Sequence, residues 1–394
     1  MGKVYILGAG FSKSAGLPLA SELLGDLKTF AHKEPKLISG LGDPQENWEV
    51  FAEAVSALTG RMLAAPMAVE EFPDLELLLT SMDWYTKLRD GALQTALRLG
   101  ITPEQRSAAH SLLDNAPVGQ FTAAHRKISW LLSDYFQSLV YLTARSESFR
   151  QQCRHIDQFA RVIVQPGDTV ITFNYDTLAE SFLCEARKWL PHDGYGVHLP
   201  LGYEPFGQPI FSDLPHSLPE LPGSPVKVLK LHGSASWVKN GDTLLLNPTF
   251  LNYLDDRWRH PAIEALVTED DVLKGHVRNM AAFPRDRGDG KPAAIIPTYL
   301  KTYAEPPYAD LWRAASAALM TAEEVVVVGY SLPKADVAAQ TLLLSVPESA
   351  PFTVVNPSGK GHYEDVLGRE IIERKQTLEI WLASRRDVYI SRAT

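Results

Sequence analysis

Three polar side chains follow apolar runs of the sequence and have the chemical types of a reactive site. Asn174 and Asp176 come directly after the run TVITF, and His232 comes directly after VKVLKL. An amide can orient a hydroxyl group or a water molecule, a carboxylate can favour developing positive charge, and an imidazole can accept a proton near neutral pH. Each also has an ordinary structural alternative, since Asn and Asp after a strand often form turns or caps and a lone histidine is commonly a core residue.

A glycine-rich stretch near the N-terminus suits a phosphate-bearing ligand. The apolar run Val4 to Leu7 predicts a strand that is buried on both faces, and Gly8 and Gly10 allow a sharp turn after it. We expect Ser12 to Gly16 to begin a helix whose N–H groups face a pyrophosphate. Lys13 stands where the dinucleotide fingerprint has its third glycine, so a turn needed only for tight packing is the alternative. A bulky residue at Gly10 is then expected to block the ligand without unfolding the chain.

Short polar segments follow five predicted strands, and their positions define the expected architecture. In open parallel α/β sheets, ligands bind beyond the carboxyl ends of the strands, where the strand order reverses. The sequence therefore predicts an α/β fold with a Rossmann-like parallel sheet, whose loops converge on one ligand. The five segments are GAGFS (8–12), TFNYD (172–176), LHGS (231–234), VGYSL (328–332) and VVNPS (354–358).

The first two strands are separated by a long, mostly helical part of the chain. A simple strand-helix-strand crossover needs only about 30 residues, so we predict a helical insertion at residues 30–165, between the two parts of the sheet domain at 1–30 and 165–394. The apolar stripe of Thr122 to Leu142 is typical of an amphipathic helix. Asn240 and Gly241 predict a hairpin, Ala293 to Ile296 a further strand, and Val388 to Ser391 an edge strand.

The composition excludes several classes of protein. The 394 residues include 47 acidic and 38 basic side chains, and the net charge of −9 argues against direct binding of nucleic acid by the whole chain. There is no apolar run long enough to cross a membrane, and we expect a cytoplasmic protein. Cys153 and Cys184 are the only cysteines, too few for a four-thiolate zinc site, and we expect them to be unpaired thiols.

Taken in order, the five polar segments resemble the motifs of the sirtuin superfamily, and they are most similar to its bacterial SIR2-like branch. The resemblance implies an NAD-binding sheet and an NAD+ glycohydrolase that releases nicotinamide and ADP-ribose as the effector of an anti-phage defence system. It also implies a homo-oligomer and a separate partner, either a HerA-type ATPase or a short Argonaute-like protein. The helical insertion is not covered by the resemblance to sirtuins proper, and it is the surface that we expect to serve assembly or activation.

The resemblance also assigns a role to each matched residue. Asn174 and Asp176 match the pair that handles the nicotinamide ribose and the carboxamide, and His232 matches the histidine that acts at the ribose hydroxyls. These three are the predicted catalytic residues. The predicted cofactor-binding residues are Gly8, Ala9, Gly10, Phe11, Ser12, Gly16, Gly329, Ser331 and Asn356.

Two departures from the deacetylating sirtuins argue against acyl-lysine chemistry. Those enzymes carry four cysteines in a small zinc module after the histidine, whereas this chain has none after Ser234, so no zinc is expected. Their first loop continues G-I-P-D-F-R, whereas the sequence here is Gly16-Leu17-Pro18-Leu19-Ala20. An NAD-dependent protein deacylase and a non-enzymatic sensor of NAD or ADP-ribose are the two alternatives. Asp336 stays open between a helix cap and a ligand contact.

Overall fold

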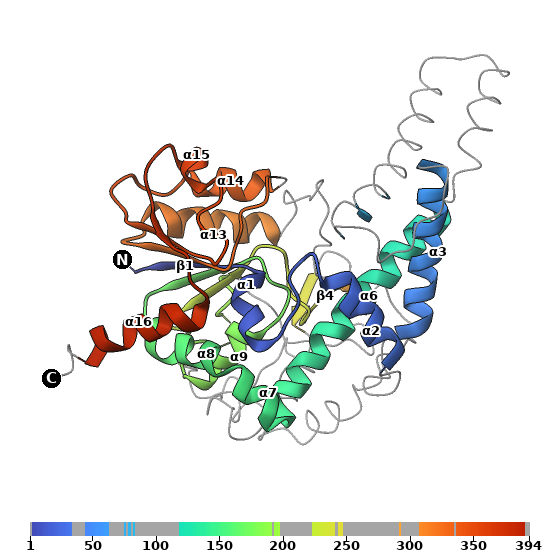
Figure 1. The fold of residues 1–394 in the computed structure, drawn as a ribbon, viewed down its shortest axis with the longest axis horizontal. Coiled ribbons are helices and arrows are strands. Elements are labelled where there is room, and N and C mark those ends of the chain that lie inside the picture. The colour runs from blue at the N-terminus through green and yellow to red at the C-terminus, as the bar shows by residue number, and fades with distance from the viewer. Residues whose placement is uncertain are drawn as a thin grey trace, which may run out of the picture. The chain divides into compact units, whose positions relative to one another are not determined.

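The computed structural model describes most of the sheet-forming part of the chain and the helices around it (Figure 1). The described residues are 2–33, 44–62, 75, 78–79, 82, 118–190, 193–197, 223–240, 243–246, 291–292, 307–334 and 336–390. The chain divides into two compact units, of which the first comprises Met1–Leu19, Phe136–Ile295 and Thr302–Thr394. The second unit comprises Ala20–Tyr135 and Ile296–Lys301. The predicted domain boundaries stay a prediction.

A six-stranded, all-parallel sheet forms the centre of the first unit. Its strands are β1 (Val4–Leu7), β2 (Thr169–Thr172), β3 (Lys227–Lys230), β7 (Val325–Val328), β8 (Phe352–Val355) and β9 (Ile372–Arg374). They lie in the order β3-β2-β1-β7-β8-β9, and every neighbouring pair is parallel. In chain order this is the 3-2-1-4-5-6 arrangement of Rossmann-type sheets. The predicted fold class is therefore confirmed.

The sequence of each strand explains its place in the sheet. All residues of β1, β7 and β8 are buried, as β-branched and aliphatic runs are when helices cover both faces of a parallel sheet. By contrast, β9 has the sequence Ile-Glu-Arg and is largely exposed, so it forms an edge. Charged side chains on an edge strand discourage pairing with other chains.

Helices cover both faces of this sheet. Figure 1 shows α13 (Tyr308–Met320), α14 (Val337–Leu343) and α15 (Tyr363–Leu367) gathered on one side. On the other side lie α8 (Arg154–Gln158), which is continued by a π-helical turn at Phe159–Ile163, and α9 (Leu178–Glu185). The edge-to-face contacts of the Phe159 ring with Tyr5 and Phe11, with ring centroids 5.3 and 5.0 Å apart, link this side to β1 and the loop after it.

A small antiparallel sheet follows the third strand of the main sheet. The predicted hairpin is confirmed, since β4 (Trp237–Asn240) pairs with β5 (Thr243–Leu246). The other edge of β4 pairs with β6 (Lys291–Pro292). The strand predicted at Ala293 to Ile296 lies outside the described residues.

The described part of the second unit is helical. It includes α2 (Leu23–Lys33), α3 (Pro44–Met62) and the first part of α6 (Val118–Arg145), which contains the predicted helix Thr122 to Leu142. Its apolar stripe is buried as expected; the buried residues of this stripe include Ile128, Leu131, Leu132 and Tyr135. The Tyr135 hydroxyl also donates a hydrogen bond of 3.3 Å to Asp26 of α2.

The prediction of an edge strand at Val388 to Ser391 is wrong. Val388 to Ile390 belong to α16 (Leu378–Ile390), which continues through the β-branched residues that suggested a strand. The edge strand is β9, at Ile372–Arg374. This segment is short and charged, so its sequence pattern does not predict a strand. It is a strand because it pairs with β8.

Candidate active site

All five predicted polar segments leave the same edge of the main sheet. In the sheet register, Leu7 at the end of β1 is paired with Thr172 of β2 and with Val328 of β7. Thr172 is paired in turn with Lys230 of β3, and Val328 with Val355 of β8. Because the strands are parallel, the loops after them share one side. The strand order reverses between β1 and β7, so the loops at Gly8 and Gly329 flank the reversal point, which is where ligands of such sheets bind.

The loops after β1 and β7 pack backbone against backbone, and this contact requires glycine. A Cβ atom at Gly8 would lie 2.6 Å from Tyr330 Cα, and one at Gly10 would lie 2.8 Å from Gly329 Cα. Gly329 has φ = +65°, and a Cβ there would lie 2.3 Å from the carbonyl carbon of Gly10. The Gly10 amide also donates a 2.9 Å hydrogen bond to the Gly329 carbonyl. Tight packing thus accounts for these glycines, whatever ligand lies beside them.

Replacing Gly329 by alanine is expected to destabilise the protein more than the same change at Gly368, which has nearly the same φ, +64°, and no atom within 4 Å of its added Cβ. The left-handed backbone costs alanine about 1–2 kcal/mol at either site. At Gly329 the overlap with Gly10 and Phe11 adds about 1–3 kcal/mol or more. Urea denaturation measures both values, and equal losses would contradict the close approach of the loops.

The same contact overturns the expectation for a bulky residue at Gly10. Its Cβ would lie 2.8 and 2.9 Å from backbone atoms of Gly329, and the backbone of this loop, directly after β7, cannot easily move away. Gly10→Trp therefore perturbs the fold as well as the site, and it cannot separate ligand binding from folding.

The helix after the glycine turn also differs from the prediction. Helix α1 begins at Ala9 instead of Ser12, lasts one turn to Ser12, and is followed by a 3₁₀ turn at Lys13–Ala15 that ends at Gly16 with φ = +85°. The Phe11 amide donates to the Gly8 carbonyl at 2.9 Å and is used inside the turn, and the Gly10 amide is used by the Gly329 carbonyl of the neighbouring loop. A single turn has a small dipole, and the predicted helix-end contribution to phosphate binding is correspondingly reduced.

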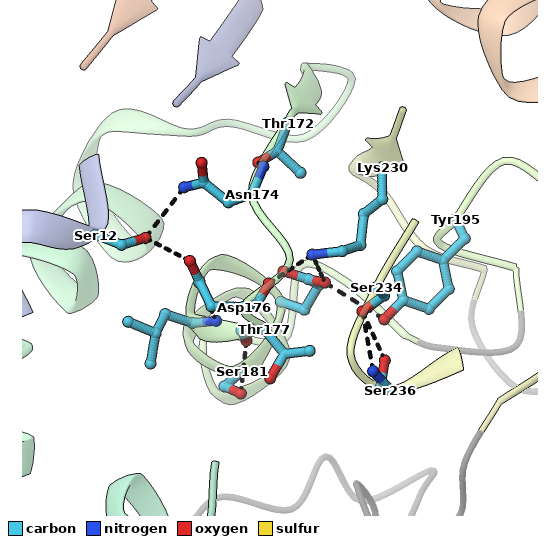
Figure 2. Close-up of polar contacts among 12 residues, drawn as sticks. Ser12, Thr172, Asn174, Asp176, Thr177, Ser181, Tyr195, Lys230, Ser234 and Ser236 are labelled. Atoms are coloured by element: carbon cyan, nitrogen blue, oxygen red, sulfur yellow. Dashed lines mark hydrogen bonds and ion pairs between the residues drawn. The ribbon is translucent and has the colours of Figure 1, made fainter. Parts of the chain in front are cut away.

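Ser12, Asn174 and Asp176 form a hydrogen-bonded cluster at the ends of β1 and β2 (Figure 2). The Ser12 hydroxyl donates to Asp176 Oδ2 at 2.7 Å and accepts from Asn174 Nδ2 at 3.1 Å. Asn174 Nδ2 also donates to the Gly8 carbonyl at 3.0 Å. Three residues predicted as site residues from distant parts of the chain thus lie together.

These contacts fix the orientation of the Asn174 amide. The Gly8 carbonyl can only accept, so the atom that faces it must be the amide nitrogen. The two amide hydrogens serve Gly8 and Ser12, and Oδ1 is the atom through which the side chain can accept a hydrogen bond from a ligand hydroxyl or a water molecule. Asn174 is half-buried, as such a role requires.

Asp176 lies behind this cluster and is 5% exposed. Its Oδ2 accepts from Ser12, and its Oδ1 accepts from the amide of Leu178 at 3.0 Å, at the start of α9. Both carboxylate oxygens are therefore engaged within the protein. This geometry suits a residue that holds Ser12 and Asn174 in place. Direct contact between Asp176 and a carboxamide stays a prediction.

A buried ion pair lies beneath the cluster, and the sequence analysis did not identify it. Lys230 Nζ is 2.8 Å from Glu180 Oε1, with side-chain exposures of 0% and 1%, and it also donates to the main-chain carbonyl of Asp176. Burial raises the pKa of Glu180, and the Lys230 ammonium opposes that rise. The Tyr195 hydroxyl donates to the same Glu180 oxygen at 3.4 Å. The sequence clue is a second lysine in β3, at the end of the strand, where the central residues Val228 and Leu229 are apolar.

His232 lies among aromatic rings and faces a carboxylate. It is 6% exposed, and its ring centroid is 5.0 Å from that of Phe173 in an edge-to-face arrangement. The Phe173 ring in turn stacks on Tyr330 with centroids 4.3 Å apart. His232 Nε2 is 3.6 Å from Oδ2 of Asp336. The imidazole is thus enclosed on the same sheet edge as Asn174.

The predicted site residues after β7 and β8 are more exposed than the cluster of Ser12, Asn174 and Asp176, or make only local contacts. Ser331 is exposed and Asn356 is half-buried. Asn356 Oδ1 accepts from the Ser358 amide at 3.1 Å, which closes a local turn, so a structural explanation of this asparagine is sufficient. The predicted contacts of Gly329, Ser331 and Asn356 with a nucleotide stay predictions.

Asp336 is confirmed as the N-cap of α14, because its side chain accepts from the Ala339 amide. As expected, Cys153 and Cys184 are not joined in a disulfide; both are buried, and burial raises the pKa of the Cys153 thiol to about 12. Within the described segments, no group of three or more His, Cys, Asp or Glu side chains could hold a metal ion. None of the described helices has the length and apolar character needed to cross a bilayer.

No protein-family model matches the chain, and no curated protein matches it. Among solved structures, it is similar to a Sir2 protein with a p53 peptide and NAD+, at 12% identity and a TM-score of 0.36 over 98% of this chain and 92% of that one. It is also similar to a Sir2 protein bound to a propionylated peptide, at 13% identity and a TM-score of 0.34 over 98% and 92% of the two chains. The likeness is weak, and the fold assignment rests on the strand order.

Proposed function

We propose that this chain binds NAD+ and hydrolyses it to nicotinamide and ADP-ribose. The observation that carries the proposal is the hydrogen bond between Asn174 and Ser12 at the carboxyl edge of the sheet, with His232 buried at the same edge against Phe173 and Asp336. A Rossmann-type strand order and two glycine loops at the reversal point support a dinucleotide as the ligand. The order of the five sirtuin-like segments supports NAD+ in particular.

The proposed reaction depends more on the orientation of the ribose and the attacking water than on a strong acid that protonates the leaving group. The bond between C1′ of the ribose and the nicotinamide nitrogen breaks with its electron pair going to the nitrogen, which leaves nicotinamide neutral and the ribose carbon oxocarbenium-like. Water then attacks C1′ and loses a proton. Asn174 Oδ1 orients the water or a ribose hydroxyl, and His232 accepts the proton and releases it to solvent.

The biological part of the proposal rests on the SIR2-like resemblance. An enzyme that consumes NAD+ without restraint would deplete its host, so an effector of anti-phage defence needs control by assembly or by a partner. A homo-oligomer and an activating HerA-type ATPase or short Argonaute-like protein fit this need. Cytoplasmic localisation belongs to the same proposal.

The deciding experiment incubates the purified chain with NAD+, with and without an acylated lysine peptide, and separates the products by chromatography. We expect nicotinamide and ADP-ribose in equal amounts and at the same rate in both samples. Release that depends on the peptide, with transfer of its acyl group to ADP-ribose, would instead identify a deacylase. Calorimetric binding of NAD+ with no product under either condition would indicate a sensor and contradict the proposed hydrolysis.

A further inference from the structure

A carboxylate from the loop before α14 faces the imidazole of His232. Asp336 Oδ2 lies 3.6 Å from His232 Nε2, and the two side chains are 5% and 8% exposed. This distance is longer than a hydrogen bond, so the contact is electrostatic and gains strength when the imidazole takes up a proton. Such burial makes it less screened by water than a surface pair.

Helix capping alone does not explain how Asp336 is held. The cap uses Oδ1, which accepts from the Ala339 amide at 3.3 Å. The other oxygen, Oδ2, accepts from the Tyr330 hydroxyl at 2.7 Å and is the atom nearest to His232. Tyr330 is fixed in turn by its stacking on Phe173 and by the Tyr363 hydroxyl, which donates to the Tyr330 carbonyl at 3.0 Å. Both oxygens of the carboxylate are therefore anchored, and Oδ2 is directed toward the histidine.

We propose that Asp336 is a positioning residue that sets the tautomer of His232 and stabilises its protonated form during the reaction. A carboxylate can only accept, so it favours the tautomer with the proton on Nε2, in which Nδ1 carries the lone pair that accepts a proton. The inference rests on the proposed function for its kinetic consequence. Among the described residues, the titratable groups next to the pair are Tyr330, whose hydroxyl donates to Asp336 Oδ2, and Tyr175, whose ring centroid is 6.4 Å from that of His232.

The test is Asp336→Asn, which keeps the size and the capping ability of the side chain and removes its charge. We expect kcat for NAD+ hydrolysis to fall by about 10-fold to 100-fold, part of what a positioned base contributes, while KM changes little. The acidic limb of the kcat profile should move to lower pH, because a neutral amide stabilises the imidazolium less than a carboxylate does. A purely structural role would not move that limb.

Three further variants complete the experiment. Asp336→Ser keeps a capping oxygen with a shorter side chain, and it should reproduce the loss if Asp336→Asn folds poorly. Ser146→Ala removes the N-cap of α7 and should leave kcat and the pH profile unchanged. In the His232→Ala background, Asp336→Asn should add little further loss. Wild-type kcat and pH profile in folded Asp336→Asn, with an active wild type, would overturn the inference and leave the proposed function standing.

A measurement that does not depend on turnover tests the coupling between Asp336 and His232 separately from the proposed NAD+ hydrolysis. The NMR titration of the His232 imidazole in the wild type and in Asp336→Asn follows the pair directly. We expect the midpoint to move to lower pH in the variant, even if the wild type proves not to hydrolyse NAD+. An unchanged midpoint would overturn the coupling between Asp336 and His232.

Discussion

Replacing Lys230 by methionine is expected to lower the free energy of unfolding by about 3–5 kcal/mol, because the change leaves the carboxylate of Glu180 buried without its cation. The loss includes the hydrogen bond from Lys230 to the Asp176 carbonyl. Methionine has a similar length and fills the space of the lysine stem, so a cavity contributes little. Chemical denaturation measures the change.

The pH dependence of this variant identifies the buried charge as the cause. Burial raises the pKa of Glu180, and removing the opposing ammonium raises it further. A carboxyl with a higher pKa in the folded state than in the unfolded state favours folding at low pH and loses that contribution as the pH rises. The difference between wild type and Lys230→Met should therefore be largest near pH 7–8 and smaller toward pH 5.

Two companion variants test the same explanation. Lys227→Met removes a lysine of the same strand whose partner Asp193 lies at 3.5 Å, with side-chain exposures of 42% and 33%, and should cost at most about 1 kcal/mol. Adding Glu180→Gln to Lys230→Met should restore part of the lost stability, because the uncompensated charge is gone. Equal losses for Lys230→Met and Lys227→Met would refute the buried ion pair as the source.

The sheet could be predicted because its signal is local. Val4 to Leu7 and the four valines of β7 are apolar, largely β-branched runs that end at glycine, and such runs are typical of central parallel strands. The rules for connections in parallel sheets leave only a few topologies, and the structure shows which of them is formed, with the reversal between β1 and β7. The meeting of Ser12, Asn174 and Asp176 follows from the same register.

Contacts between side chains that are distant in the chain could not be predicted from the sequence. Nothing local to Lys230 indicates that Glu180 compensates it, and nothing local to Asp336 distinguishes a cap from a contact with His232. The start of α1 was misplaced because Ala9 and Gly10 carry no side chain that marks a helix end. The last strand was misplaced because Val388 and Ile390 favour strands locally, whereas a continuing helix decides their conformation.

Replacing His232 by alanine is expected to reduce NAD+ turnover by about 100-fold to 10,000-fold, the range that a positioned general base contributes. Binding of NAD+ should persist, because the proposed pyrophosphate contacts lie in the loops after β1 and β7. Turnover by product chromatography and binding by calorimetry measure the two effects separately. His32→Ala changes an exposed histidine of α2 and serves as the matched control, with turnover expected to remain unchanged.

Asn174→Ala should lose turnover to a similar extent, but its effect on folding differs from that of His232→Ala. The amide of Asn174 donates to the Gly8 carbonyl and to Ser12, so its removal should also cost about 1–3 kcal/mol of stability. Activity must therefore be compared at a temperature where both variants are folded, as checked by circular dichroism. Wild-type turnover by either folded variant would remove that residue from the proposed mechanism. Wild-type turnover by both would show that the chemistry occurs elsewhere in the chain.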